Sequence, residues 1–185
     1  YKDIEVDGNY AGKLFNGFAK VRDENIELDF DGSVDFKEDV PQMDFVSTIY
    51  KSNLLKLGID TLSSGISGKL YINLIGSRLD NLDGTISVAD VRYRRNARLL
   101  RLDTASLVAD YTDSVRQLQL RSDIADGEIV GQYNFSHLGN ALYSYAANLL
   151  PQIVKKDTNQ KVNENFRFSV NIKKPYLLTN FLWDD

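Results

Sequence analysis

The chain has 185 residues, 43% of them hydrophobic and 26% charged, which is typical of one soluble globular domain or of a piece of a larger one. Its net charge of -4 argues against a nucleic-acid binder, because such proteins need a clustered positive field. The absence of cysteine excludes disulfides and thiolate metal sites. No apolar run approaches the roughly 18 to 20 residues that span a bilayer, and no signal peptide is evident. Because the chain starts at Tyr1 without a methionine, we expect residues 1–185 to be one β-rich segment of a larger protein.

The first 36 residues predict three or four short strands. Apolar and polar residues alternate in each, which is typical of a half-buried strand. The apolar positions are Ile4 and Val6, then Phe15, Gly17, Ala19 and Val21, then Ile26, Leu28 and Phe30, and, after Gly32, Val34 and Phe36. Arg22 to Asn25 are expected to form a polar hairpin turn. The strands are too acidic on one side to be buried on both.

A further strand is expected from Met43 to Tyr50, after Pro41. It leads into residues 53–58, where Asn53 can cap one helical turn and Gly58 can end it. The leucines of that turn are expected to close one edge of the core.

The clearest alternation follows, in residues 65–88. Leu70, Ile72 and Leu74 alternate with polar neighbours, a turn-rich segment spans 76–83, and Gly84 opens a second strand. More strands are expected at 90–93, 99–104, 114–122 and 166–172. The strand that starts at Gly127 and reaches Phe135 is expected to be the longest regular one.

Residues 136–150 break this pattern. Leu138, Leu142, Tyr145 and Leu149 fall at helical spacing, which predicts an amphipathic helix that can continue past Pro151 to about residue 154. Residues 155–163 read as an exposed loop. The apolar end at 176–183 is expected to pack on the segment or to start a following unit, within residues 164–185.

Signatures of catalysis are missing from the sequence. His137 is the only histidine, and no nucleophile elbow, phosphate loop, dinucleotide fingerprint or zinc motif is present. Asp80–Gly84 and Asp123–Gly127 lack calcium-loop spacing and are expected to be turns. The basic run Arg92–Arg98 is expected to be the solvated face and loop end of a strand. We predict no enzyme, no cofactor and no metal site.

A family resemblance rests on the order of these segments. The stretch Gly32–Phe36, the strand after Pro41 with its turn at 53–58, and above all Gly65–Ile86 resemble the repeat of TamB-type translocation and assembly module proteins of the AsmA-like superfamily. The resemblance extends through Asp90–Tyr93 and Leu118–Tyr133, so it covers about residues 10–135. It depends on spacing and apolar positions, with no catalytic motif.

The resemblance implies a periplasmic segment of an inner-membrane-anchored envelope protein. Such a protein carries phospholipid along an apolar β-groove and supports outer-membrane biogenesis or protein assembly, with an outer-membrane assembly protein as partner. It also implies the fold that we expect here: a mostly β, elongated, twisted antiparallel sheet curling into a taco-like groove, with one amphipathic helix near 136–154.

On this interpretation, phospholipid acyl chains contact one apolar row of side chains. The expected lining residues are Leu70, Ile72, Leu74, Ile86, Val88, Leu100, Leu102, Leu118, Leu120, Ile129 and Phe135. The same alternation would also suit a sandwich in which these residues pack on an opposite sheet or on the helix. Two other functions stay open: an extracellular adhesion or scaffold module that binds a protein partner through a sheet edge, and a carbohydrate-binding or carbohydrate-active domain with paired carboxylates.

Overall fold

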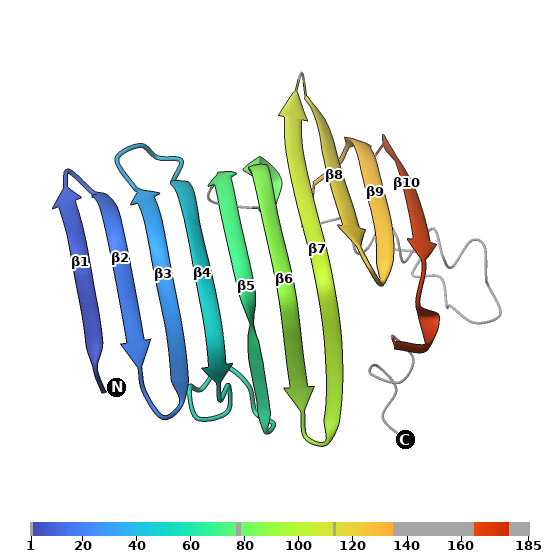
Figure 1. The fold of residues 1–185 in the computed structure, drawn as a ribbon. Coiled ribbons are helices and arrows are strands. Elements are labelled where there is room, and N and C mark those ends of the chain that lie inside the picture. The colour runs from blue at the N-terminus through green and yellow to red at the C-terminus, as the bar shows by residue number, and fades with distance from the viewer. Residues whose placement is uncertain (1, 77–78, 113, 135–164, 178–185) are drawn as a thin grey trace.

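A single antiparallel sheet of ten strands makes up the fold, and the strands lie in the sheet in the same order as in the sequence (Figure 1). The computed structural model describes residues 2–76, 79–112, 114–134 and 165–177. One 3-10 turn, η1 (Leu79–Asn81), lies between β5 and β6. The strands are β1 (Ile4–Ala11), β2 (Leu14–Arg22), β3 (Ile26–Asp35), β4 (Gln42–Ser52), β5 (Ser64–Ile75), β6 (Asp83–Arg95), β7 (Arg98–Thr112), β8 (Val115–Ser122), β9 (Ala125–Gln132) and β10 (Asn165–Ile172).

Short connections join most neighbouring strands from β1 to β9, and two of them were predicted from the sequence. In the β2–β3 turn, the Asp23 amide donates to the Ile26 carbonyl at 2.9 Å, and the Asn25 amide donates to the Asp23 carboxylate at 2.9 Å. After β4, the Lys56 amide donates to the Asn53 side chain at 3.1 Å and closes one turn, which ends at Gly58 with φ +72°. Both predicted turns are therefore confirmed.

The cross-strand register assigns every strand residue to one of two faces, because residues directly opposite each other point to the same side. Ile72, Ile86 and Leu107 lie opposite one another on β5, β6 and β7, and we call their side of the sheet the apolar face. The neighbouring row, Tyr71, Ser87 and Ser106, lies on the polar face. The two faces differ as the alternation predicts.

Two strand boundaries differ from the sequence-based expectation. Strand β3 runs without interruption through Gly32, so the first 36 residues form three strands. The longest strand is β7, with 15 residues, and the expectation that the strand from Gly127 is the longest was wrong, since β9 has eight. Alternation fails near Asp103, and there the Asp123 carboxylate accepts hydrogen bonds from the amides of Asp103 and Thr104, at 3.2 and 3.4 Å. This local support lets β7 continue past the irregularity.

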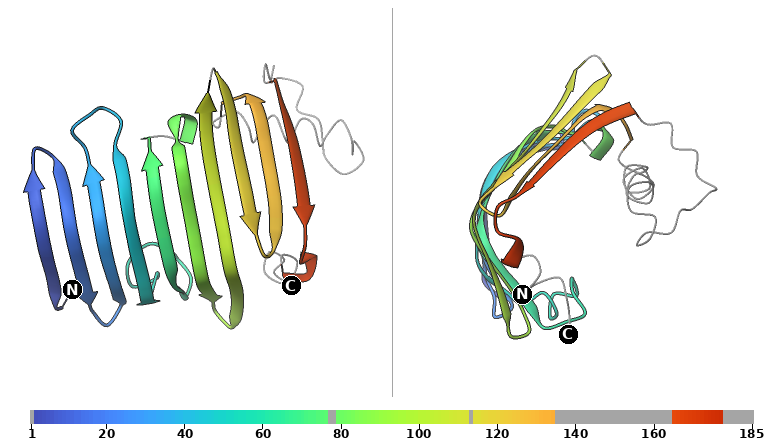
Figure 2. Two further views of the ribbon diagram at one scale, coloured as in Figure 1. Left: turned by 45° about the horizontal axis from the view of Figure 1, so that its top comes forward. Right: turned by 90° about the vertical axis from the view of Figure 1, so that its right-hand side faces the viewer.

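The sheet is bowed but neither closed nor strongly curled (Figure 2). Residues 53–63 lie on the concave side, where the Asp60 carboxylate accepts from the Tyr93 hydroxyl at 3.4 Å. Tyr93 belongs to the apolar face, so this face is the concave one. Strand pairing shows register shifts at Glu27–Leu28 and Ser67–Lys69, and sheets curve mainly at such irregularities. Because the sheet has few such register shifts, the described strands do not form the expected taco-like groove. The expected helix near 136–154 lies outside the described residues.

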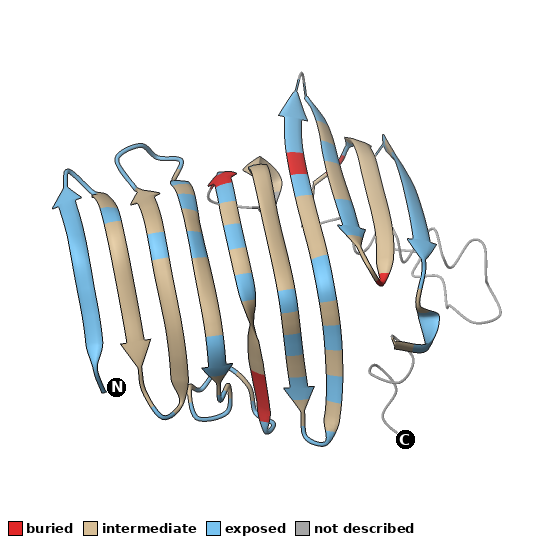
Figure 3. Ribbon diagram, in the orientation of Figure 1, coloured by how far each residue is buried: buried red, intermediate tan, exposed pale blue. Residues whose placement is uncertain are grey.

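The described part of the chain forms one layer, with no second sheet against the apolar face. Among its hydrophobic residues only Leu74, Ala109, Ile124 and Tyr133 are buried, at 3 to 9% relative exposure, and most other strand residues are half-buried or exposed (Figure 3). Ten strands about 4.8 Å apart give a sheet roughly 43 Å wide. Since so few of the described residues are buried, they include no opposite sheet, which was one of the arrangements that the alternation allowed.

Gly32 sits in the middle of β3, where a side chain would collide with β4. It has φ +145°, and a Cβ atom there would lie 2.3 Å from the Asp44 carbonyl oxygen and 2.5 Å from the Phe45 Cα. Both the conformation and the close approach favour glycine. This position therefore restricts β3 to its observed register against β4.

We expect Gly32→Ala to destabilise the sheet by roughly 1 to 3 kcal/mol, the usual cost of holding a residue in a disfavoured backbone conformation. The measurement is the free energy of unfolding in urea. Ser33→Ala, on the polar face one residue away, is the matched control and is expected to change stability little. Equal stability of the two variants would contradict the assignment.

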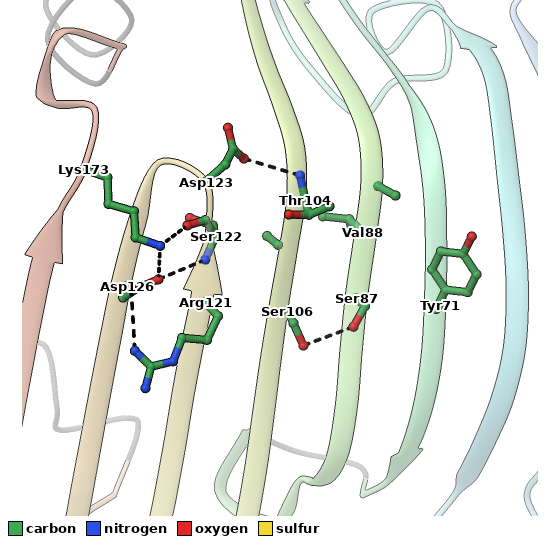
Figure 4. Close-up of a pocket in the computed structure, with 12 residues that line it drawn as sticks. Tyr71, Ser87, Val88, Thr104, Ser106, Arg121, Ser122, Asp123, Asp126 and Lys173 are labelled. Atoms are coloured by element: carbon green, nitrogen blue, oxygen red, sulfur yellow. Dashed lines mark hydrogen bonds and ion pairs between the residues drawn. The ribbon is translucent and has the colours of Figure 1, made fainter.

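Two ion pairs attach the end of β10 to the β8–β9 turn, and Figure 4 shows the one between Lys173 and Asp126. Lys173 Nζ lies 2.8 Å from the Asp126 carboxylate, and Lys174 Nζ lies 2.7 Å from the Asp123 carboxylate. The hydrogen bond from Lys173 holds the pKa of Asp126 below its usual range. Partial burial opposes ionisation of Asp123, but the bonds from Lys174 and the Thr104 amide outweigh it and lower that pKa as well. Both pairs favour the folded state when the carboxylates are ionised.

The stability from these pairs is expected to be lost on acidification. Groups with a lowered folded-state pKa contribute stability above their unfolded pKa of about 3.9, and this contribution disappears as the pH falls through the folded value. The thermal midpoint of the wild type should therefore fall more steeply between pH 5 and pH 3, roughly the range over which carboxylates titrate, than that of D123N/D126N. Parallel curves for the two proteins would contradict this role of the carboxylates.

Candidate functional site

The structure brings the expected lining residues together on the concave apolar face. All the described ones lie there: Leu70, Ile72, Leu74, Ile86, Val88, Leu100, Leu102, Leu118, Leu120 and Ile129. They come from β5 to β9, and Phe135 lies outside the described residues. The sequence therefore grouped these side chains on one surface, although their contact with lipid stays a prediction.

One cross-strand row on this face runs through all ten strands. It begins with three glycines on β1, β2 and β3, continues through large apolar side chains on β4 to β8, and ends at the opposite edge. In order, the row is Gly8, Gly17, Gly32, Phe45, Ile72, Ile86, Leu107, Leu120, Gly127 and Val170. The apolar surface is thus continuous across the strands.

Several residues of this surface were absent from the predicted lining. The rings of Phe15, Phe30 and Phe45 follow one another across β2, β3 and β4, with centroids 6.1 and 4.9 Å apart. On β10, Phe166 and Phe168 also lie on this face, with centroids 6.2 Å apart. The signal that could have found them is the same alternation, extended to the outer strands. The apolar face therefore reaches beyond β5–β9 in both directions.

Exposure of the lining residues matches an open surface. Leu74 is buried at 5%, Leu120 is 38% exposed, and the other described lining residues are half-buried. A half-buried aliphatic side chain is packed by its neighbours on the same face and still presents its end to a ligand. Such a face can remove water from a flat or chain-like apolar ligand, at roughly 25 cal/mol for each Å² of apolar surface covered.

Charged groups on the apolar face lie near the strand ends. Arg116, near the start of β8, contacts the Tyr111 ring at 5.1 Å and the Asp80 carboxylate of η1 at 3.8 Å, and it also donates to the Tyr133 carbonyl. Burial raises the pKa of the Tyr133 hydroxyl, so this group stays protonated at neutral pH. At the other end, Arg95 and Arg98 lie opposite each other beside the β6–β7 turn. Aliphatic side chains lie at the centre of the apolar face.

The polar face carries a shallow depression of about 620 Å³ (Figure 4). Small side chains form its floor, including Ser87 and Ser106, whose hydroxyls lie 3.1 Å apart, and Tyr71 stands on one side. Its two carboxylates, Asp123 and Asp126, are held ionised by their lysine partners. Glycosidases need one carboxyl group with a raised pKa to donate a proton, so this pair is unsuited to that chemistry.

Within the described ranges, other kinds of site find no support. No group of three or more histidine, cysteine, aspartate or glutamate residues there could hold a metal ion. The search of the same residues for a helix long and apolar enough to cross a membrane found none. The Asp80–Gly84 and Asp123–Gly127 segments form turns and strand starts, as expected.

The extended apolar face is therefore the candidate functional site. Comparisons with protein-family models, with curated proteins and with solved structures gave no match for this chain.

Proposed function

We propose that this chain is a segment of a TamB-type, AsmA-like envelope protein, and that its apolar face carries phospholipid acyl chains. The protein would be anchored in the inner membrane and cross the periplasm, and it would support outer-membrane biogenesis or protein assembly. The segment acts as a surface for transfer and carries out no bond chemistry.

The observation that carries this proposal is the row of large apolar side chains across β4 to β8, with no second layer over it among the described residues. A sheet that served only as half of a sandwich would bury this row against a partner layer. An acyl chain offers the complementary surface, since it is apolar along its whole length and needs no polar recognition.

The energetics suit transfer better than tight storage. Complete burial of one methylene group contributes about 0.8 kcal/mol, and a bowed sheet that covers one side of a chain contributes roughly half of that. The attraction is spread evenly along aliphatic rows, so a lipid can shift from one row to the next without losing a single strong contact. Stronger curling into the taco-like groove expected from the resemblance would increase the covered area.

A second candidate function rests on β1. All eight residues of this edge strand are exposed, so its outer backbone groups are accessible for pairing with a strand of another protein. On this alternative the chain is an adhesion or scaffold module, and the apolar face is covered by its partner.

Photocrosslinking from the two faces distinguishes lipid from protein as the occupant. A photoreactive residue in place of Ile72 or Leu102 should yield phospholipid adducts, because both side chains lie on the apolar face. The same residue at Asn73 or Arg101, one position along on the polar face, is the matched control and should yield few. Mass spectrometry of adducts formed in cells is the measurement. Protein adducts at Ile72 and Leu102, without lipid, would instead favour the second candidate.

A charge placed on the apolar row should reduce lipid binding. We expect Ile72→Lys to lower the phospholipid that co-purifies with the protein by roughly tenfold, since it removes about 1.5 kcal/mol or more of apolar burial. Tyr71→Lys makes the corresponding change on the polar face and is expected to have little effect. Lipid extraction and quantification per mole of protein is the measurement, and equal lipid content in the two variants would contradict the proposal.

A further inference from the structure

The end of the β6–β7 hairpin is strongly basic, although the whole chain carries a net charge of -4. Five arginines lie in the parts of β6 and β7 that adjoin the turn between them: Arg92, Arg94, Arg95, Arg98 and Arg101. Arg95 pairs directly with Arg98, and Arg92 with Arg101. Like charges directly opposite each other repel.

The connection between β4 and β5 lies at the same end of the sheet as the β6–β7 turn (Figure 1), and it carries exposed apolar side chains. The segment 53–63, which connects β4 to β5, presents Ile59 at 71% exposure and Leu55 at 41%, and Leu99 of the hairpin is 48% exposed. The Asn96 amide donates to the Ser63 carbonyl at 2.7 Å and holds the hairpin against this segment. Cations and protruding aliphatic side chains therefore form one surface, which we call the basic end: residues 53–63 and 92–101.

Acidic groups neutralise only part of this charge. The Asp60 carboxylate accepts from Ser64 Oγ at 2.5 Å, a bond that lowers its pKa, with the charge of Arg95 as a smaller cause. Asp60 therefore stays ionised and offsets about one arginine. Asp60 is the one carboxylate in residues 53–63 and 92–101, so the five arginines outnumber the carboxylates of the basic end.

A depression on the polar face adds a place for an anionic group. It has a volume of about 150 Å³, and Lys51, Arg92 and Arg94 all line it, with Leu99 at its border. Lys51 also lies 3.9 Å from Glu27, an exposed pair that water screens. Three cations around one small depression are suited to a phosphate-bearing headgroup.

We propose that the basic end binds the surface of a bilayer that contains anionic lipids. Clustered arginine and lysine side chains are attracted to a negatively charged membrane surface, and exposed aliphatic side chains beside them insert at the boundary between headgroups and acyl chains. Charge and exposed aliphatic side chains together match an anionic bilayer, whereas a neutral or basic protein surface would not be attracted to this end.

The basic end adjoins the apolar face. The apolar pairs Val91–Leu102 and Tyr93–Leu100 lead along the concave face directly to Arg95 and Arg98. A bilayer held at this end would lie next to the apolar face. Membrane binding at the basic end depends on charge and exposed aliphatic side chains, so it does not require that the apolar face carries lipid.

Vesicle flotation tests the proposal with the whole chain. Vesicles of phosphatidylcholine alone are compared with vesicles of equimolar phosphatidylcholine and phosphatidylglycerol. We expect binding only to the anionic vesicles at about 0.1 M salt, and weaker binding at 1 M, where the screening length falls from about 10 to about 3 Å. R94Q/R95Q should bind about thirtyfold more weakly, because each cation near a membrane surface contributes close to a factor of five to ten.

Two controls make the result specific to this end of the sheet. K13Q/K37Q removes the same charge from turns at the opposite end and should bind as the wild type does, with circular dichroism confirming that each variant is folded. Ile59→Ser should weaken binding, whereas Phe36→Ser, at an exposed site near Lys37, should not. Equal binding to both kinds of vesicle, or equal loss in the two double variants, would overturn the proposal.

Discussion

The structure depends on one constraint, the register of each strand against the next. A slip of one residue would turn the apolar side chains of that strand to the polar face. Near the middle of the sheet the alternation breaks at Asp90 on β6 and at Asp103 on β7, at the same level of the pairing. Because the two irregularities match, Val91 and Leu102 still lie opposite each other on the apolar face. The paired irregularities therefore leave the apolar surface uninterrupted.

A single-layered sheet has no core between two layers, so other interactions stabilise it. Each inner strand is bonded on both sides, and the half-buried apolar residues gain stability from neighbours on the same face. Ion pairs across the polar face add local support, as between Arg22 and Asp29 at 2.5 Å, although exposed pairs contribute little each. The edge strand β1 carries Glu5 and Asp7, and charged residues on an edge oppose uncontrolled pairing with other sheets.

Much of this fold could be predicted from sequence, because alternation and turn residues are local signals. They identified the strands, the turn capped by Asn53 and ten described residues of one face. The length of β7 could not be predicted, since the side chain that supports its irregular point, Asp123, lies 20 residues away in sequence. Nor could the exposure of the face be predicted, because alternation does not tell whether a second layer covers Phe30 or Ile72. Curvature also escaped prediction, because it depends on a few irregular positions and not on the repeat.

The strand order has a consequence for how such a protein can change in length. Within the described residues, every strand pairs only with the strands before and after it in sequence order. Stability is then nearly a sum over neighbouring interfaces, as in solenoid proteins, and from β1 to β9 folding can spread from any hairpin without closing a long loop. A whole hairpin inserted at a turn would shift the later strands sideways and leave their faces unchanged. The distance that the apolar surface covers is therefore set by the number of hairpins, and evolution can lengthen or shorten it in steps of two strands.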